Sequence, residues 1–313
     1  MSKEPVIEAI ELTKTYNGLK AVDKLNLRIE EGEIFGFLGP NGSGKTTSIL
    51  MMLGLTEPTS GTVRVCGYNS TREPLKVKNL AGYIPENVGF YDDLTTGYNL
   101  AYMARLSDIP EGVIKQRIEE VLDTVGLKGM AYRKVGEFSR GMRQRLAIAD
   151  VLMRMPKIAF LDEPTAGIDP RGIRQTLDLI SRIAKEHKMT IIMSSHQLAQ
   201  VQRVCTHVGI MQKGKMVVQG LIDQLGREFL GGGRFKIEVR LAGVAAAIIE
   251  AIKQVKGVMK VDRPEENLLV ISSRDDVRSQ IAKVIVDNNG LLEQMNVVSY
   301  ALEDIYMKYS VED

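Results

Sequence analysis

Long hydrophobic runs are missing from this sequence: no apolar stretch approaches the roughly 20 residues that a membrane-spanning helix needs. The first residues, Met1–Pro5, are polar and lack the apolar core of a signal peptide. Cysteine is scarce, and Cys66 and Cys205 are too far apart in the sequence to match a metal-binding spacing. The three histidines form no metal-ligand pattern either. We therefore expect a cytosolic protein with reduced thiols.

A strong excess of one charge is also absent. The chain has 41 basic and 39 acidic residues, a net charge of +2, which excludes nucleic acid as the default partner. With 313 residues, 44% hydrophobic and 26% charged, the composition is that of an ordinary globular protein, and the length allows two domains.

Hydrophobic periodicity predicts an α/β fold for the first two thirds of the chain. Residues 6–30 alternate apolar and polar around a turn at Tyr16-Asn17-Gly18, and residues 61–67 add a short strand, which together predict a small antiparallel sheet. Residues 91–135 and 139–153 show helical spacing, so we expect a helical subdomain at about 87–152. Apolar runs at 158–161 and 190–194 flank a helical pattern at 171–183. Such alternation predicts a parallel, doubly wound sheet.

A second domain is expected after Gly231-Gly232-Gly233, which has the composition of a hinge. Beyond it the pattern runs strand, helix, strand, strand, helix, strand, the order of a ferredoxin-like α+β module. We therefore predict domains at 1–230 and 234–313. An amphipathic stretch at 301–307 follows.

The most informative motif is the glycine-rich run at residues 39–46, GPNGSGKT, directly after the apolar run at 34–38 and before a helical pattern. Strand, glycine turn and helix form the context of a phosphate-binding P-loop. Glycines let backbone N–H groups turn toward phosphate oxygens, and the helix directs its positive end to the same place. Lys45 would add charge at the β- and γ-phosphates, and the Thr46 hydroxyl could ligate Mg²⁺.

Two carboxylates follow the apolar run at 158–161. Behind a P-loop, Asp162 would hold Mg²⁺ through water, opposite Thr46. Glu163 would orient or deprotonate an attacking water molecule.

Further segments carry a family resemblance. Residues 138–145, FSRGMRQR, resemble the signature motif of ABC transporter ATPases, and residues 164–169, PTAGID, resemble their D-loop. His196, after the strand at 191–195, resembles their switch histidine, and Tyr16 is at the position of an aromatic that stacks on adenine. The resemblance covers about residues 5–225, with the motifs in the family's order.

This resemblance implies a P-loop NTPase core with an antiparallel β subdomain and a helical signature subdomain. It also implies a homodimer in which two chains enclose ATP and Mg²⁺, so that Ser139 and the Gly141 backbone face the γ-phosphate of the partner's nucleotide. A serine and a glycine at a helix start suit that role, because they supply a hydroxyl and exposed N–H groups. A helix N-cap is the plain alternative for Ser139.

The expected site residues can now be stated by role. Glu163 and His196 are expected to be catalytic, and Thr46, Asp162 and Glu86 to lie at the metal. The residues expected to bind nucleotide are Tyr16, Gly39, Asn41, Gly42, Ser43, Gly44, Lys45, Thr46, Thr47, Glu86, Ser139 and Gly141.

Several residues depart from the commonest family pattern. The signature has Arg140 and Met142 where glycine and glutamine are usual, and Glu86 replaces the usual glutamine of the Q-loop. These variants resemble export-type ABC ATPases for drugs, antibiotics or lipids, as does the ending at 302–306. The implied partner is an integral membrane permease, and the implied location is the cytoplasmic face of the cell membrane.

Residues 86–105 are the expected permease-contacting surface, with apolar side chains that could equally form the core of the helical subdomain. Those side chains are Val88, Phe90, Tyr91, Leu94, Tyr98 and Met103. An alternative function is a soluble ABC ATPase that acts on nucleic acid or ribosomes. Such proteins usually have two ATPase units, long coiled coils or Fe–S cysteines, which this chain lacks. A P-loop kinase or GTPase would lack the signature segment.

Overall fold

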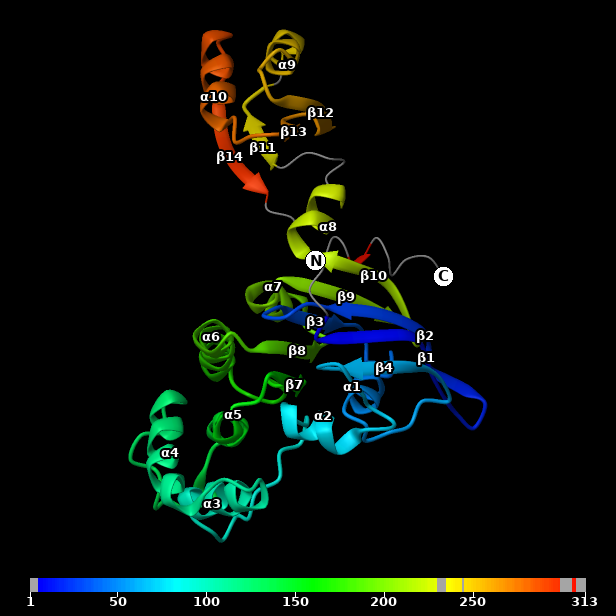
Figure 1. Ribbon diagram of the computed structural model, residues 1–313. Coiled ribbons are helices and arrows are strands. Elements are labelled where there is room, and N and C mark those ends of the chain that lie inside the picture. Colours follow the sequence, from blue (N-terminus) through cyan, green and yellow to red (C-terminus); the bar gives the residue numbers. More distant parts are fainter. Residues whose placement is uncertain (1–4, 230–234, 244, 299–305, 308–313) are drawn as a thin grey trace. The chain divides into compact units, whose positions relative to one another are not determined.

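The computed structural model describes residues 5–229, 235–243, 245–298 and 306–307 (Figure 1). The chain divides into two compact units, residues 1–219 and 220–313. The predicted hinge, and with it the predicted boundary at 230–234, lies outside the described residues. So does most of the amphipathic stretch predicted at 301–307.

The first unit is built on a sheet with the strand order β10-β9-β3-β8-β7-β6. Its neighbouring pairs from β9 to β6 are all parallel, so the prediction of a parallel sheet is confirmed. Every residue of the three central strands β3, β8 and β7 is buried, which explains their continuous apolar sequences. The strands are β3 (Ile34–Leu38), β6 (Ala81–Ile84), β7 (Ile158–Asp162), β8 (Thr190–Ser195), β9 (His207–Gln212) and β10 (Lys215–Leu221).

A second sheet in this unit has the order β2-β1-β4-β5, and its pairs are antiparallel. Asn17 and Gly18 form the hairpin turn between β1 and β2, with φ angles of 48° and 83°. Asn-Gly favours such left-handed turn conformations, as the sequence predicted. The strands are β1 (Ile7–Tyr16), β2 (Leu19–Ile29), β4 (Ser60–Val65) and β5 (Tyr68–Asn69).

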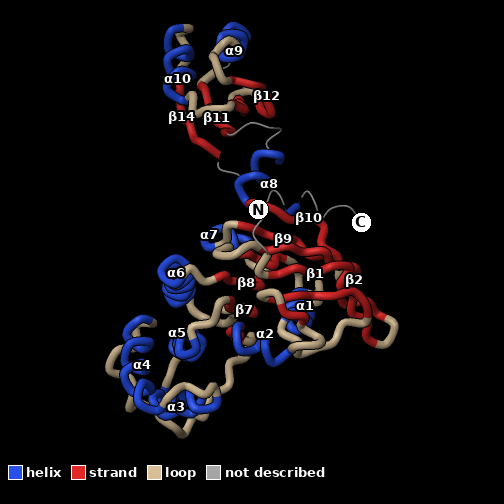
Figure 2. The backbone as a smooth tube through the Cα atoms, viewed as in Figure 1, coloured by secondary structure: helices blue, strands red, loops and turns tan. Residues whose placement is uncertain are grey.

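Some helices of this unit pack on the sheets, and three others form a cluster with one another. Helices α3, α4 and α5 pack together as the predicted helical subdomain, seen as a group of blue tubes in Figure 2. Asp169 caps α6 by accepting hydrogen bonds from two backbone N–H groups. The helices of this unit are α1 (Lys45–Met52), α2 (Pro74–Leu80), α3 (Thr96–Leu106), α4 (Glu111–Thr124), α5 (Arg140–Arg154), α6 (Pro170–His187) and α7 (Leu198–Val204), with a 3-10 turn at Val135–Glu137.

One hydrophobic cluster joins the two sheets through α1. It includes Leu25 of the antiparallel sheet, Phe37 and Phe160 of the parallel sheet, and Met52 of α1, all fully buried. Burial of side chains of this size stabilises the fold by about 1.5–3 kcal/mol each. Because α1 is held between both sheets, its first turn is fixed in place.

The second unit has its own sheet, with the order β12-β13-β11-β14 and antiparallel pairs. Its element order from β11 onward is βαββαβ, that of a ferredoxin-like module. Ile237, Ile271 and Ile281 belong to a hydrophobic cluster confined to this unit. Its elements are α8 (Ile222–Phe229), β11 (Phe235–Leu241), α9 (Ala246–Lys253), β12 (Val258–Glu265), β13 (Leu268–Ser273), α10 (Arg278–Asp287) and β14 (Leu292–Val298). Throughout the described residues, every helix is too short or too polar to cross a bilayer.

Candidate active site

The strand order brings the predicted motifs to one edge of the parallel sheet. Strand β8 lies between β3 and β7, and in this register Ser195 pairs with Leu38 and Ser194 pairs with Asp162. The loops that follow β3, β7 and β8 therefore emerge side by side. Ligands of open α/β sheets bind at this carboxyl edge of the strands.

The P-loop joins β3 to α1 and depends on glycine at two tight positions. Gly44, with φ of 104°, directly precedes α1 in the left-handed region. A Cβ atom there would collide with the carbonyl oxygen of Ala21 on β2. At Gly39 a Cβ would collide with the carbonyl oxygen of Met211 on β9. Since both sheets press on the loop, only glycine fits at these positions.

Backbone hydrogen bonds tie the same loop to its neighbours. The Gly214 N–H donates to the Ser43 carbonyl at 3.1 Å, and the Asp23 N–H donates to the Gly214 carbonyl at 2.8 Å. Gly214 lies in the turn between β9 and β10, and Asp23 lies on β2. Backbone hydrogen bonds therefore link the P-loop, through this turn, to β2.

Lys45 is held inside the loop. Its side-chain nitrogen donates to the carbonyl oxygens of Gly39 at 2.7 Å and Pro40 at 3.0 Å. Burial lowers the pKa of Lys45, and the carboxylates of Glu163, Asp162 and Glu86 act in the opposite direction. The result is a buried ammonium group surrounded by backbone dipoles and carboxylates, which suits contact with a polyanion.

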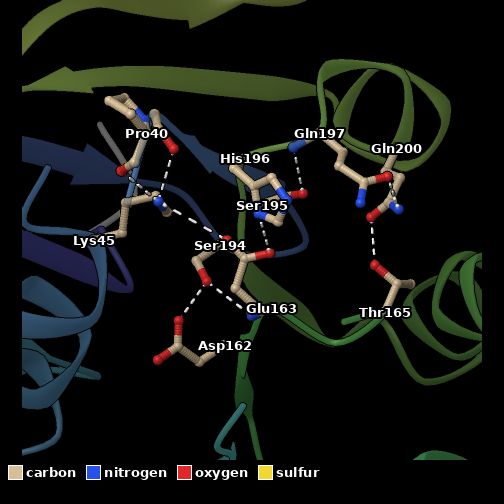
Figure 3. A network of polar contacts seen from close by, with 11 residues as sticks. Pro40, Lys45, Asp162, Glu163, Thr165, Ser194, Ser195, His196, Gln197 and Gln200 are labelled. Carbon is tan, nitrogen blue, oxygen red and sulfur yellow. Dashed lines mark hydrogen bonds and ion pairs between the residues drawn. The ribbon is translucent and has the colours of Figure 1, made fainter. Parts of the chain in front are cut away.

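Ser194 connects the two carboxylate residues (Figure 3). Its hydroxyl donates to Asp162 Oδ1 and accepts a hydrogen bond from the Glu163 N–H at 2.9 Å. Asp162 is 2% exposed, and this bond fixes one of its oxygens, which leaves the other as a potential metal ligand. Sequence reasoning did not assign a role to Ser194. Its only signal was a serine at the end of a buried apolar strand.

Glu163 has two oxygens in different environments. Its Oε2 lies 3.0 Å from His196 Nδ1, and because a carboxylate only accepts, Nδ1–H is the donor. Its Oε1 lies 3.9 Å from the Lys45 nitrogen and, although buried, has no hydrogen-bond partner in the described residues. The backbone of Glu163 is left-handed, with φ of 46°. Strained, oriented carboxylates of this kind are typical of active sites.

A pocket of about 360 Å³ lies over the P-loop. Among the predicted site residues its lining includes Tyr16, Asn41, Gly42, Gly44, Lys45, Thr46, Thr47, Glu86 and Glu163, and Ala21 is an additional lining residue. Tyr16 is 47% exposed there, with the Lys14 nitrogen 5.0 Å from its ring centroid. Glu86 follows β6 in the sequence, and in the fold it lines the same pocket as the P-loop.

The signature residues do not line this pocket. Ser139 caps α5 by accepting a hydrogen bond from the Met142 N–H at 3.3 Å. Gly141 packs near Ile168, which lies in the D-loop. Arg143 forms a two-pronged ion pair with Asp92, at 2.6 and 3.1 Å, which anchors the start of α5 to the loop before α3.

A second pocket of about 180 Å³ lies between β6, α3 and α5. From the predicted permease surface, its lining includes Val88, Phe90, Tyr91 and Met103, whereas Tyr98 lines a different pocket on α3 and α4. Asp150 is the one charged side chain among the described residues lining it. Burial raises the pKa of Asp150, and nearby Arg154 opposes that effect. Burial and the charge of Asp162 raise the pKa of Tyr83, on the same wall, to about 12.

Comparison with known proteins decides the family. Residues 22–166 match the family model described as ABC transporter. The bacitracin transport ATP-binding protein BcrA of Bacillus licheniformis is 36% identical over 97% of this chain and 96% of its own length. The chain belongs to the ABC transporter ATP-binding proteins. As a member of that family, it is an ATP-binding and ATP-hydrolysing protein.

Two further ABC proteins are similar to this chain. The linearmycin resistance ATP-binding protein LnrL of Bacillus subtilis strain 168 is 34% identical over 85% of this chain and 84% of its own length. The solved structure of cbiO1 from Clostridium perfringens, described as part of the ABC transporter complex cbiONQ, is 28% identical with a TM-score of 0.66. It covers 71% of this chain and 91% of its own. These likenesses favour a transport ABC ATPase over one that acts on nucleic acid or ribosomes.

The residues of the pocket fit the nucleotide that the family binds. Residues of a glycine loop, a buried ammonium group and the N-terminus of α1 line one pocket, the combination that phosphate binding requires. The Ser43 hydroxyl is buried in this loop without a hydrogen-bond partner among the described residues. Oxygen donors of Thr46, Asp162 and Glu86 are of the type that Mg²⁺ prefers.

Proposed function

We propose that the pocket over the P-loop binds ATP together with Mg²⁺, through the residues predicted from the sequence. The P-loop amides and Lys45 would hold the β- and γ-phosphates, and Tyr16 would stack on the adenine. The Thr46 hydroxyl and Asp162 would hold Mg²⁺, with Glu86 reaching it through water. When bound, the ion would neutralise charge that develops on the phosphate oxygens.

In the proposed reaction, Glu163 is the general base. Its Oε1, buried and without a hydrogen-bond partner in the described residues, would take the proton of the attacking water. His196 would orient the carboxylate by donating from Nδ1 to Oε2. Ser194 would hold the backbone of Glu163 and the Asp162 side chain in a common frame. The observation that carries this proposal is the meeting of Lys45 and Glu163 in one pocket.

We propose further that two copies of the chain enclose the nucleotides. Ser139 and Gly141 do not line the pocket of their own chain, although a serine hydroxyl and helix-start N–H groups suit a γ-phosphate. A second copy would therefore supply them, and each ATP would lie between one P-loop and the partner's signature. This arrangement follows the family resemblance.

The chain would power a separate membrane permease from the cytoplasmic face, as an exporter. The pocket beside β6, α3 and α5 is the proposed docking place, because it is mostly apolar and adjoins Glu86 in sequence. The export assignment is supported by relatives named for bacitracin transport and linearmycin resistance. The unit after residue 233 would be accessory, without a part in nucleotide chemistry.

A glutamate substitution tests this proposal. Glu163→Gln keeps the shape of the side chain but cannot accept the proton, so hydrolysis should fall by about 10²-fold or more. MgATP binding, measured by calorimetry, should persist, and sedimentation should show an ATP-dependent dimer. The exposed carboxylate Glu186 offers a matched control, since Glu186→Gln should leave all three measurements unchanged. Hydrolysis by Glu163→Gln at the wild-type rate would exclude Glu163 as the base.

A further inference from the structure

A single acidic side chain lies in a mostly apolar pocket. Asp150, on α5, lines the pocket of about 180 Å³ between β6, α3 and α5, and it is the one charged lining residue that the structure describes there. Taking a carboxylate out of water in such surroundings costs free energy unless a partner compensates it. The apolar side chains of the lining include Ile84, Val88, Phe90, Met103 and Ala147.

The described part of the chain does not supply that partner. The Asp150 carboxylate makes no hydrogen bond or ion pair there. Arg154 lies one turn further along α5, and its charge opposes the rise that burial causes in the pKa of Asp150. The two side chains nevertheless form no ion pair with each other. Both carboxylate oxygens are therefore available to a group that enters the pocket from outside.

The polar side chains of the same lining do not fill this role. The Asn99 side chain binds the backbone of Tyr91, by accepting from its N–H at 2.9 Å and donating to its carbonyl at 3.0 Å. The Tyr83 hydroxyl makes no hydrogen bond within the described residues. Burial and the charge of Asp162 raise the pKa of Tyr83 to about 12, so it stays an uncharged phenol. The pocket thus offers one carboxylate and one free hydroxyl within apolar walls.

We propose that Asp150 recognises a basic side chain of the membrane permease, a lysine or arginine carried on an otherwise apolar segment. The inference rests on the proposed function, in which the permease docks at this pocket. A cation gives the carboxylate the donor that it lacks, and the apolar walls take up the aliphatic stem of the incoming side chain. Asp150 is thereby a specificity-determining residue, because a segment of the same shape with a neutral or acidic side chain leaves it unpaired.

Folding alone does not explain an acid at this position. An unpaired, largely buried carboxylate lowers the stability of the free chain, and an apolar residue would suit the lining better. Residues that serve binding commonly carry such a cost, which the partner then offsets. The unpaired state of Asp150 in the free chain is therefore what a recognition role requires.

Three small probes of one length test this chemistry without the permease. Hexylammonium resembles a lysine side chain, hexanol is its neutral counterpart, and hexanoate carries the opposite charge. In NMR titrations of the full-length chain, hexylammonium should shift the amide signals of Phe90 and Asp150, and hexanoate should not. Asp150→Asn should weaken the affinity for hexylammonium about tenfold or more and leave that for hexanol within about twofold.

Asp108 offers a matched control. It is exposed, and its side chain makes no hydrogen bond or ion pair in the described residues. Asparagine tolerates its left-handed φ of 57°. Asp108→Asn removes the same charge and should leave the affinity for hexylammonium unchanged. The inference is overturned if hexylammonium does not bind at the pocket, if it binds no more tightly than hexanol, or if Asp150→Asn binds it as tightly as the wild type.

A charge exchange tests the same residue in the assembled complex. The full-length chain is co-expressed with its permease and purified from membranes, and the permease retained is measured. Asp150→Lys should lower retention about tenfold or more, and Asp108→Asn should not. A cooperative melt and MgATP binding show that each variant folds. Changing the cytoplasmic lysines and arginines of the permease to glutamate, one at a time, should restore retention with Asp150→Lys at one position.

Failure of this inference differs from failure of the proposed function. If Asp150→Lys retains the permease as the wild type does, or if no exchange restores retention, the role of Asp150 is wrong and the docking and ATPase assignments stand. If the wild-type chain itself retains no permease, the proposed docking fails, and the inference fails with it.

Discussion

Ser194 offers the sharpest test of how the carboxylates are held. The hydroxyl is fully buried and makes two bonds at once, one to the charged Asp162 side chain and one from the Glu163 N–H. Ser194→Ala removes both with little change in volume. Asp162 then loses a donor, and the partly buried backbone N–H of Glu163 loses its acceptor.

The loss can be estimated from these two bonds. A hydrogen bond to a charged group contributes about 1.5–3 kcal/mol, and an orphaned buried N–H costs about 1–3 kcal/mol. Since the two effects overlap in one hydroxyl, we expect the free energy of unfolding to fall by about 3 kcal/mol. For a unit of this size that corresponds to a drop in Tm of about 6–12 °C. Hydrolysis should fall as well, because Asp162 and Glu163 lose their common anchor.

Ser195, the next residue of β8, supplies the control. It is 1% exposed, and its hydroxyl accepts one hydrogen bond, from the Gln197 N–H at 3.0 Å, with no charged partner. Ser195→Ala should therefore cost about 1 kcal/mol, or about 2–4 °C in Tm. Thermal melts followed by circular dichroism, without nucleotide, compare the two variants. Equal drops in Tm would refute the argument that Ser194 holds a charge and an amide together.

Three further predictions concern other parts of the chain. Lys45→Ala should abolish tight MgATP binding in calorimetry while the melt stays cooperative; unchanged affinity would contradict the P-loop assignment. Burial raises the pKa of Asp150 above its ordinary value of 3.8 in the folded chain. The free energy of unfolding should therefore fall as pH rises from this ordinary pKa through the folded-state pKa. Asp150→Asn should accordingly raise Tm at pH 7 and give no gain below the ordinary pKa. Truncation after Gly232 should leave ATP binding nearly unchanged; a truncated chain that melts cooperatively but cannot bind ATP would refute the separation of roles.

The sequence predicted those elements whose local pattern and tertiary role agree. Strands β3, β7 and β8 are buried on both faces, so their apolar runs were unambiguous. The helix at 171–183 was predicted because α6 buries a single face. Short elements such as β6 and α7 were not predicted. Four and seven residues are too few for a period to stand out, and their bounds depend on neighbours distant in sequence.

Contacts between side chains were harder to predict from the sequence than motifs were. The P-loop and the carboxylates follow from residue type and spacing, whereas Ser194 matters only because β8 lies beside β7 in one particular register. Asp150 is one charge among many on a helix, and only the fold places it in a pocket with the side chains of residues 83–91. Sequence patterns therefore indicate which groups have the chemistry that the site needs, and the register of the sheet decides which of these groups come into contact.

The hydrogen-bonded chain from Ser43 through Gly214 to Asp23 has a consequence for observation as well as for stability. The Gly214 amide proton is protected by the Ser43 carbonyl of the P-loop, the proposed phosphate site. Its exchange with deuterium therefore reports how often that loop opens. Because β10 begins at the next residue, the same amide lies at the head of the strand that carries the chain out of the first unit. A single amide group thus reports on the opening of the P-loop from the side of the turn between β9 and β10.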